Sequence, residues 1–158
     1  MKVSIICVGK IKEKFFTDAI DEYKKRLSRF CDFEVIEIPD LPIPDNASEA
    51  QKEQIKNREG EKILEKLKGN PYIISLCIEG KTLSSEELAK TVADATQTTS
   101  HVAFIIGGSL GLSDEVKSKS KLRLSFGRMT LPHQLMRVVL TEQIYRSFMI
   151  NANTGYHK

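Results

Sequence analysis

The sequence predicts an α/β domain built on a mainly parallel sheet, with helices on both faces of that sheet. Apolar runs of strand length occur at 2–8, 33–38, 71–78, 102–106 and 122–126. The second to fifth runs each follow a segment that is long enough, or nearly so, to hold a helix, and this alternation is typical of parallel sheets. We expect a single domain over 1–158, because the one Pro-rich stretch, 39–46, is too short and too apolar to separate two domains.

The first three helices are predicted from apolar spacing and from capping residues. A helix over about 13–30 places one apolar stripe at three- and four-residue spacing, formed by Phe16, Ile20, Tyr23, Leu27 and Phe30. The patterns Ser48-x-x-Gln51 and Ser84-x-x-Glu87 are capping boxes, which satisfy exposed amide groups where a helix begins. Helices are therefore expected to start just after Ser48 and just after Ser84.

The last helix, from Pro132 to about Ile150, is apolar over more than half of its circumference. Such a helix must be covered on two sides. Because the sheet of a small domain covers one side, we expect a second copy of the chain to cover the other, as a two-fold homodimer. The remaining stripe, Gln134, Arg137, Thr141 and Tyr145, is expected to line a cleft.

Composition excludes several classes of protein. With 158 residues, 41% of them hydrophobic and 28% charged, the chain is neither disordered nor rich enough in long apolar runs to span a membrane, which takes about 18 residues. The three cysteines, Cys7, Cys31 and Cys77, lie far apart and lack the spacing of a metal site. We expect free thiols, no metal, no membrane and a cytoplasmic location.

Charge is divided unevenly along the chain. Residues 1–30 carry eight Lys and Arg and four Asp and Glu, and residues 116–158 carry eight Lys and Arg with Glu142 as the single acidic residue. The middle of the chain, residues 31–115, is acidic, with eight Lys and Arg and sixteen Asp and Glu. Basic ends of this kind suit a polyphosphate such as nucleic acid, although a solvated fringe of lysines is an equally simple interpretation.

Two loops follow predicted strands, where open α/β sheets bind ligands. The first is Gly107-Gly108-Ser109-Leu110-Gly111, whose glycines let a ligand approach the backbone, so that a side chain at Gly108 would occupy ligand space. The second, 125–133, contains Met129 and Leu131, which suit an adenine-sized apolar slot. By contrast, Gly80-Lys81-Thr82 lacks the first glycine of a phosphate-binding P-loop and is expected to form a turn.

The three histidines have different expected roles. His101 begins a buried strand and is expected to be structural, whereas His133 is either a cap or a cleft residue. His157 lies in the terminal Tyr156-His157-Lys158, which is either a frayed end or a group placed for proton transfer.

Several segments together resemble one known family. They are Ile6-Cys7-Val8-Gly9-Lys10, Pro132-His133-Gln134, Arg137-Val138, Leu140, Glu142-Gln143, Tyr145-Arg146 and the terminal Tyr156-His157-Lys158. These residues resemble the ribosomal RNA large-subunit methyltransferase H family of the SPOUT class. The resemblance covers the whole chain. It implies a C-terminal trefoil knot, a homodimer, S-adenosylmethionine as cofactor, and methylation of N3 of a pseudouridine in the 23S rRNA of the assembled ribosome.

The resemblance also implies roles for individual residues. Those that would bind the cofactor are Leu76, Gly108, Gly127, Arg128, Met129, Thr130, Leu131 and Pro132. For the transfer itself, the chemistry of the reaction leads us to expect His157 as the base that removes the N3 proton. We expect Tyr156 to orient the substrate base, and Arg137 or Lys158 to stabilise negative charge on its carbonyl oxygens. One departure is that family members usually carry a glycine where this chain has Asn153, which predicts a shifted tail.

Two other classes of function agree less well with the sequence. A non-catalytic RNA-binding module explains the charge but leaves both loops and the tail without a role. A nucleotide-dependent oxidoreductase or phosphotransferase explains a glycine loop, but the chain lacks the motifs of both.

Overall fold

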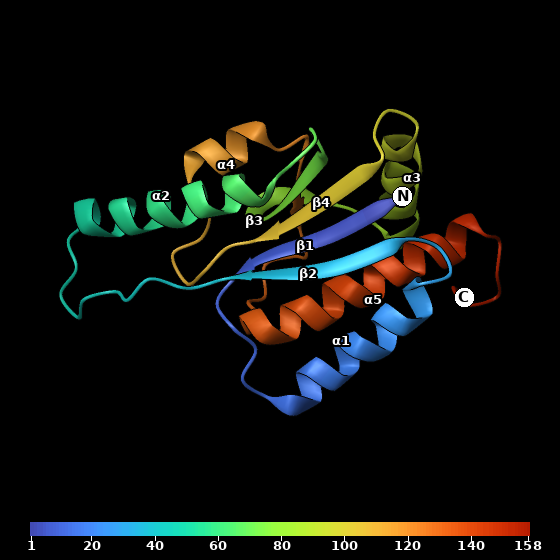
Figure 1. The fold of residues 1–158 in the computed structure, drawn as a ribbon, viewed down its shortest axis with the longest axis horizontal. Coiled ribbons are helices and arrows are strands. Elements are labelled where there is room, and N and C mark those ends of the chain that lie inside the picture. The colour runs from blue at the N-terminus through green and yellow to red at the C-terminus, as the bar shows by residue number, and fades with distance from the viewer.

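The computed structural model describes residues 1–158, and its five strands form one sheet. The strands are β1 (Lys2–Val8), β2 (Asp32–Ile38), β3 (Tyr72–Thr82), β4 (His101–Ile106) and β5 (Leu122–Ser125), arranged in the order β2-β1-β4-β3-β5. Every neighbouring pair is parallel, so the predicted fold class is confirmed (Figure 1). The implied trefoil knot stays a prediction, because strand order and pairing do not define how the chain threads.

Two of the five helices begin just after Ser48 and Ser84, where the capping boxes predict. The helices are α1 (Lys14–Leu27), α2 (Glu49–Lys66), α3 (Ser85–Thr96), α4 (Asp114–Lys119) and α5 (His133–Asn151). Both capping boxes are present: the Gln51 backbone amide donates to the Ser48 hydroxyl, and the Gln51 side chain accepts from the Ser48 amide, with the same pattern at Ser84 and Glu87. The first helix ends at Leu27, three residues before the predicted Phe30.

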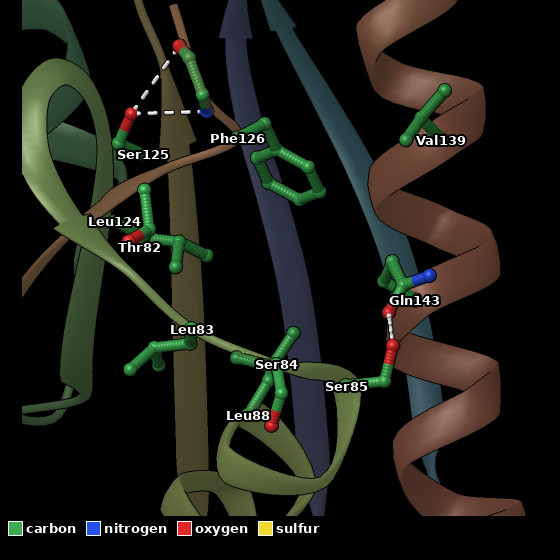
Figure 2. Close-up of a pocket in the computed structure, with 11 residues that line it drawn as sticks. Thr82, Leu83, Ser84, Ser85, Leu88, Leu124, Ser125, Phe126, Val139 and Gln143 are labelled. Atoms are coloured by element: carbon green, nitrogen blue, oxygen red, sulfur yellow. Dashed lines mark hydrogen bonds between the residues drawn. The ribbon is translucent and has the colours of Figure 1, made fainter.

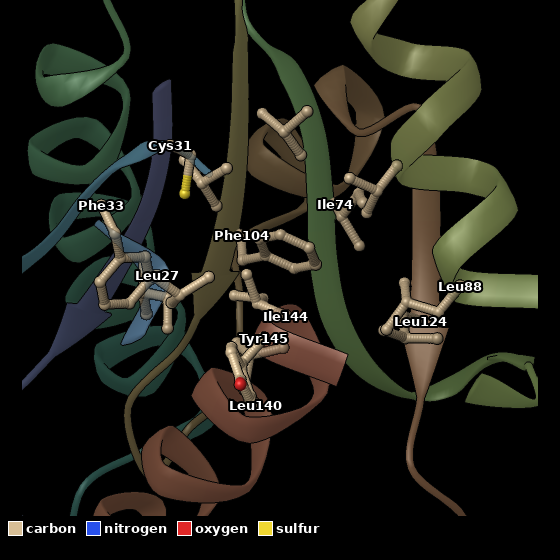
Figure 3. Packing of buried hydrophobic residues seen from close by; sticks show 14 of the residues in the cluster. Leu27, Cys31, Phe33, Ile74, Leu88, Phe104, Leu124, Leu140, Ile144 and Tyr145 are labelled. Atoms are coloured by element: carbon tan, nitrogen blue, oxygen red, sulfur yellow. The ribbon is translucent and has the colours of Figure 1, made fainter. Parts of the chain in front are cut away.

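Neighbouring residues of a strand point to opposite sides, so a buried sheet has two apolar faces. Helices cover both of them, as predicted. On one face α1, α3 and α5 pack over a core that includes Leu27, Phe104 and Ile144 (Figure 3). On the other face α2 and α4 cover a smaller core that includes Ile63 and Val116, and Figure 1 shows these two helices across the sheet from α1 and α5. Between these two layers, the carboxyl ends of all five strands lie along one edge of the sheet, because every neighbouring pair is parallel.

Strand β3 contains a bulge that the sequence did not predict. Leu76 and Lys81 both lie opposite Leu124 of β5, so the four residues between them leave the pairing. A Cβ atom at Gly80 would lie 2.6 Å from the carbonyl oxygen of Arg123, and only glycine permits this close passage of two backbones. The predicted turn at Gly80-Lys81-Thr82 is thus wrong, because this segment rejoins the strand.

Helix α5 is held against the sheet by a buried arginine. Arg137 is 1% exposed; its Nη1 donates to the Glu37 carboxylate at 2.9 Å, and its Nη2 donates to the carbonyl oxygens of Val8 at 3.0 Å and Gly9 at 2.8 Å. Thr141 and Tyr145 are buried as well. Three of the four residues of the predicted cleft stripe thus pack inward, while Gln134 is only partly buried. None of the four lines the cavity at the strand ends, and Arg137 ties α5 to the ends of β1 and β2.

Candidate active site

A cavity of about 410 Å³ opens at the carboxyl edge of the sheet, where β3, β4 and β5 end. Its walls are the β3 bulge, the glycine loop after β4 and the β5–α5 loop. Six of the eight predicted cofactor residues line it, namely Leu76, Gly108, Gly127, Met129, Thr130 and Leu131. Arg128 and Pro132 belong to the same loop but are not among the lining residues. Folding thus brings together the two loops that the sequence singled out.

Tight turns present main chain to this cavity. The Gly111 amide donates to the Gly108 carbonyl at 3.0 Å and closes the first loop. In the second loop the Gly127 amide donates to the Ser125 hydroxyl at 3.1 Å, and Gly127 has φ +111°, in the region that favours glycine. A Cβ atom at Gly127 would meet nothing within 4 Å. A ligand can therefore approach the backbone of this loop closely.

The reason for a glycine at position 108 differs from the one predicted. A Cβ atom there would lie 3.2 Å from a methyl group of Val8 and 3.3 Å from the carboxylate of Glu59. A larger side chain would consequently crowd Val8 of β1 and Glu59 of α2, neither of which lines the cavity. Glu59 is 5% exposed; burial raises the pKa of its carboxyl group, and the Leu41 amide donates to it at 3.1 Å.

Several lining residues were missed by sequence reasoning. They include Glu79 from the bulge, Lys117 from α4 and Met136 from α5. The Lys117 ammonium lies 2.6 Å from the Glu79 carboxylate and lowers the pKa of that carboxyl group. No local motif marks the bulge, and Lys117 stood out only as one charge of a basic segment.

A second, smaller hollow of about 270 Å³ adjoins the first (Figure 2). Both are lined by 124–127, including Phe126, and the second extends to the start of α3 and to Val139 of α5. The Ser85 hydroxyl donates to the Gln143 side chain at 2.8 Å and closes its far end. The cofactor-sized cavity thus continues, past Phe126, toward α3 and α5.

The chain leaves α5 through a left-handed residue. Asn153 has φ +52°, its amide donates to the Ile150 carbonyl at 3.0 Å, and the Thr154 amide donates to the Met149 carbonyl at 3.1 Å. This pair of bonds is a Schellman motif, in which glycine is usual and asparagine is tolerated. Asn153 therefore supplies the backbone conformation that a glycine commonly supplies at a helix end.

The tail after this turn folds back onto α3 and α5 and is not frayed. The Tyr156 hydroxyl donates to the Glu142 carboxylate at 3.1 Å; burial, and then this bond, raises the pKa of Tyr156 to about 12. His157 Nδ1 lies 3.1 Å from Nη1 of Arg146, and its Nε2 lies 2.8 Å from the Glu86 carboxylate. Since a guanidinium only donates, Nδ1 accepts and Nε2 carries the proton, which describes a neutral imidazole.

The residues expected to do chemistry are not in the cavity. None of Arg137, Tyr156, His157 and Lys158 lines it. The role expected for Arg137 at the substrate oxygens stays a prediction; in this chain its guanidinium is buried and donates to Glu37 and to two carbonyl groups. One chain therefore forms a cofactor-sized cavity and, separately, a docked tail.

The other histidines divide as the sequence allowed. His101 is structural: its Nε2 lies 2.7 Å from the Ser4 hydroxyl, and burial lowers its pKa. His133 lines the cavity and makes no cap, so it is a cleft residue. No group of three or more His, Cys, Asp or Glu side chains is placed to hold a metal ion, and no helix has the length and apolarity to cross a bilayer.

The fold and the cavity define a class of protein. A parallel α/β sheet whose strand-end loops enclose a cavity at the carboxyl edge is a small-molecule or cofactor-binding α/β domain. A family model described as "Predicted SPOUT methyltransferase" matches residues 1–157. The chain belongs to the SPOUT methyltransferase family.

Curated relatives match over their whole length. The chain is 57% identical to a ribosomal RNA large subunit methyltransferase H of Clostridioides difficile, 56% to that of Pediococcus pentosaceus and 55% to that of Streptococcus uberis, with all of both chains covered in each case. A solved Legionella pneumophila methyltransferase with bound SAM is far more distant. It has a TM-score of 0.46 and 16% identity, and the match covers 94% of this chain and 66% of that one.

Proposed function

We propose that this protein transfers a methyl group from S-adenosylmethionine to N3 of a pseudouridine in the 23S rRNA of the assembled ribosome, in the cytoplasm. The observation that carries the proposal is the 57% identity, over the full length, to an enzyme named for methylation of large-subunit rRNA. The convergence of six predicted cofactor residues on one cavity also supports it.

The cavity suits the proposed cofactor. Its volume lies within the roughly 300–1,000 Å³ of small-molecule sites. Met129 and Leu131 supply an apolar surface for an adenine ring, while the backbone around Gly108 and Gly127 supplies amide and carbonyl groups for its polar edge. When bound, S-adenosylmethionine supplies a methyl group on a sulfonium; the protein then has to hold an acceptor nitrogen in line with it.

The acceptor N3 carries a proton that must leave, and His157 is proposed to take it. The neutral imidazole is kept in one tautomer by Glu86, which accepts from Nε2 and leaves Nδ1 as the basic atom. In the docked tail Nδ1 faces Arg146, so this contact must open before Nδ1 takes the substrate proton. Tyr156 is proposed to orient the substrate base, and the exposed Lys158 to stabilise charge on its carbonyl oxygens.

The site is proposed to be completed by a second copy of the chain. Helix α5 contacts α1 and α3, yet Leu135, Val138 and Val139 on it stay only partly buried. The docked tail lies on the same helical layer, whereas the cavity lies at the sheet edge. A two-fold contact through this layer would bring the tail of one copy to the cavity of the other.

The dimer is tested by light scattering and by Val139→Glu, which would bury an unpaired carboxylate in the contact. We expect the wild type to be dimeric and the variant to dissociate. A stable and active wild-type monomer would overturn this part of the proposal.

The activity is tested by mass mapping of rRNA after incubation with S-adenosylmethionine. Intact 70S ribosomes and naked rRNA are compared, and calorimetry measures cofactor binding separately. We expect one methyl group on one pseudouridine of 23S rRNA in the 70S sample alone. Cofactor binding without any methylated pseudouridine would contradict the proposed substrate.

A further inference from the structure

Among the 20 residues that line the cavity, Glu79 and Lys117 are the only acidic side chain and the only Lys or Arg side chain. Glu79 comes from the β3 bulge and Lys117 from α4, and their charged groups lie 2.6 Å apart. Every other lining side chain is apolar, a glycine, or a neutral polar group, apart from His133. Any ligand in this cavity that carries opposite charges meets its counter-charges at this one place.

The ion pair is easily opened. Its side chains are 56% exposed at Glu79 and 23% exposed at Lys117, and ion pairs open to water contribute little to stability. Lys117 lowers the pKa of the Glu79 carboxyl group, which is therefore ionised at neutral pH. Both members thus keep full charge while being free to exchange partners.

We propose that Glu79 and Lys117 form the subsite for the zwitterionic amino-acid end of the cofactor, an inference that rests on the proposed use of S-adenosylmethionine. The Glu79 carboxylate accepts from the α-ammonium group, and the Lys117 ammonium donates to the α-carboxylate. One ion pair within the protein is exchanged for two with the ligand. The glycine loop and the apolar residues of the β5–α5 loop are left for the adenosine part.

Two alternative roles for the same ion pair predict different ligand preferences. Glu79 could face the sulfonium, in which case it would distinguish S-adenosylmethionine from S-adenosylhomocysteine, which lacks the positive sulfur. The pair could instead only latch the bulge to α4, in which case breaking it would affect every ligand of the cavity alike.

Calorimetry with three ligands separates the amino-acid subsite from the sulfonium contact and the latch. S-adenosylmethionine and S-adenosylhomocysteine carry the amino-acid end, whereas 5′-methylthioadenosine lacks it. We expect Glu79→Gln and Lys117→Met each to lower the affinity for S-adenosylmethionine and S-adenosylhomocysteine by roughly tenfold or more. The affinity for 5′-methylthioadenosine should stay unchanged. Lys119→Met is the matched control, because Lys119 pairs with Glu115 on α4 and does not line the cavity.

Any different pattern of affinities contradicts the subsite. An equal decrease in affinity for all three ligands would show that the pair is a latch. A decrease confined to S-adenosylmethionine would show a sulfonium contact, and either result overturns the proposed subsite. Unchanged affinities would overturn it as well. If the wild-type protein bound none of the three, the proposed cofactor itself would fail. Thermal unfolding of each variant confirms that it is folded.

Discussion

The cavity and the docked tail are built in opposite ways. The cavity consists of turns at the ends of three neighbouring strands, with a backbone bond from Gly111 to Gly108 and a left-handed Gly127. The tail is held instead by side chains: Tyr156 donates to Glu142, Arg146 donates to His157, and His157 donates to Glu86. Cofactor binding should therefore depend on the sheet, and methyl transfer on a segment that can be removed without disturbing the sheet.

The largest expected effect is loss of turnover when the chain is cut after Thr154. Thr154 is kept because its amide closes the end of α5. The truncated protein should fold and bind S-adenosylmethionine, yet lose the roughly 10²–10⁴-fold contribution of a positioned base in single-turnover methylation. His157→Ala should fall in the same range and recover partly at higher pH, where the substrate imide loses its own proton. Wild-type turnover by either variant would place the base elsewhere.

The next largest effect concerns stability and separates Arg137 from the chemistry. Arg137→Met removes the side-chain donor to the carbonyl groups of Val8 and Gly9 and one of the two donors to Glu37, which keeps the Ile11 amide. Because two main-chain carbonyl groups lose this bond, the free energy of unfolding should fall by about 2–4 kcal/mol. Lys14→Met, which breaks an exposed pair with Asp18, is the control and should change little. Denaturant unfolding measures both. An Arg137→Met protein of normal stability that has lost turnover would instead mean that Arg137 contacts the substrate.

Two glycines in left-handed conformations offer a matched pair. Gly127 (φ +111°) lines the cavity, whereas Gly69 (φ +76°) lies just before β3, and a Cβ atom would meet nothing at either position. Alanine at each should cost about 1–3 kcal/mol of stability through backbone strain. Only Gly127→Ala should also lower the affinity for S-adenosylmethionine that calorimetry measures. Equal affinities for S-adenosylmethionine in the two variants would mean that this loop is not part of the cofactor site.

The smallest effect is spectroscopic and reports on the docked tail. The pKa of Tyr156 is raised to about 12 by burial and by Glu142, so docking favours the neutral phenol. This contribution is complete below the ordinary tyrosine pKa near 10 and is lost as pH rises through about 12. An absorbance titration should therefore contain a tyrosine that ionises late, and Tyr156→Phe should remove that step. An unchanged titration would mean that the tail is not docked in solution.

The sequence predicted the parts that depend on local patterns. Apolar runs identified all five strands, Ser48 and Ser84 marked two helix starts, and the two loops marked the cavity. It missed the β3 bulge, because the close approach at Gly80 depends on a strand that is distant in sequence. It also did not predict that Arg137 is buried, since a helix that is apolar over more than half of its circumference does not reveal which side meets the sheet.

The separation of cavity and tail is tested most directly by mixing two inactive variants. One is cut after Thr154 and keeps its cavity; the other, Gly127→Val, keeps its tail but has a strained, β-branched residue at the cavity. If the tail of one copy serves the cavity of the other, reassorted dimers should recover about a quarter of wild-type methylation, since half are mixed and each has one complete site. Mixed dimers that form without any recovered methylation would contradict a site shared between two copies.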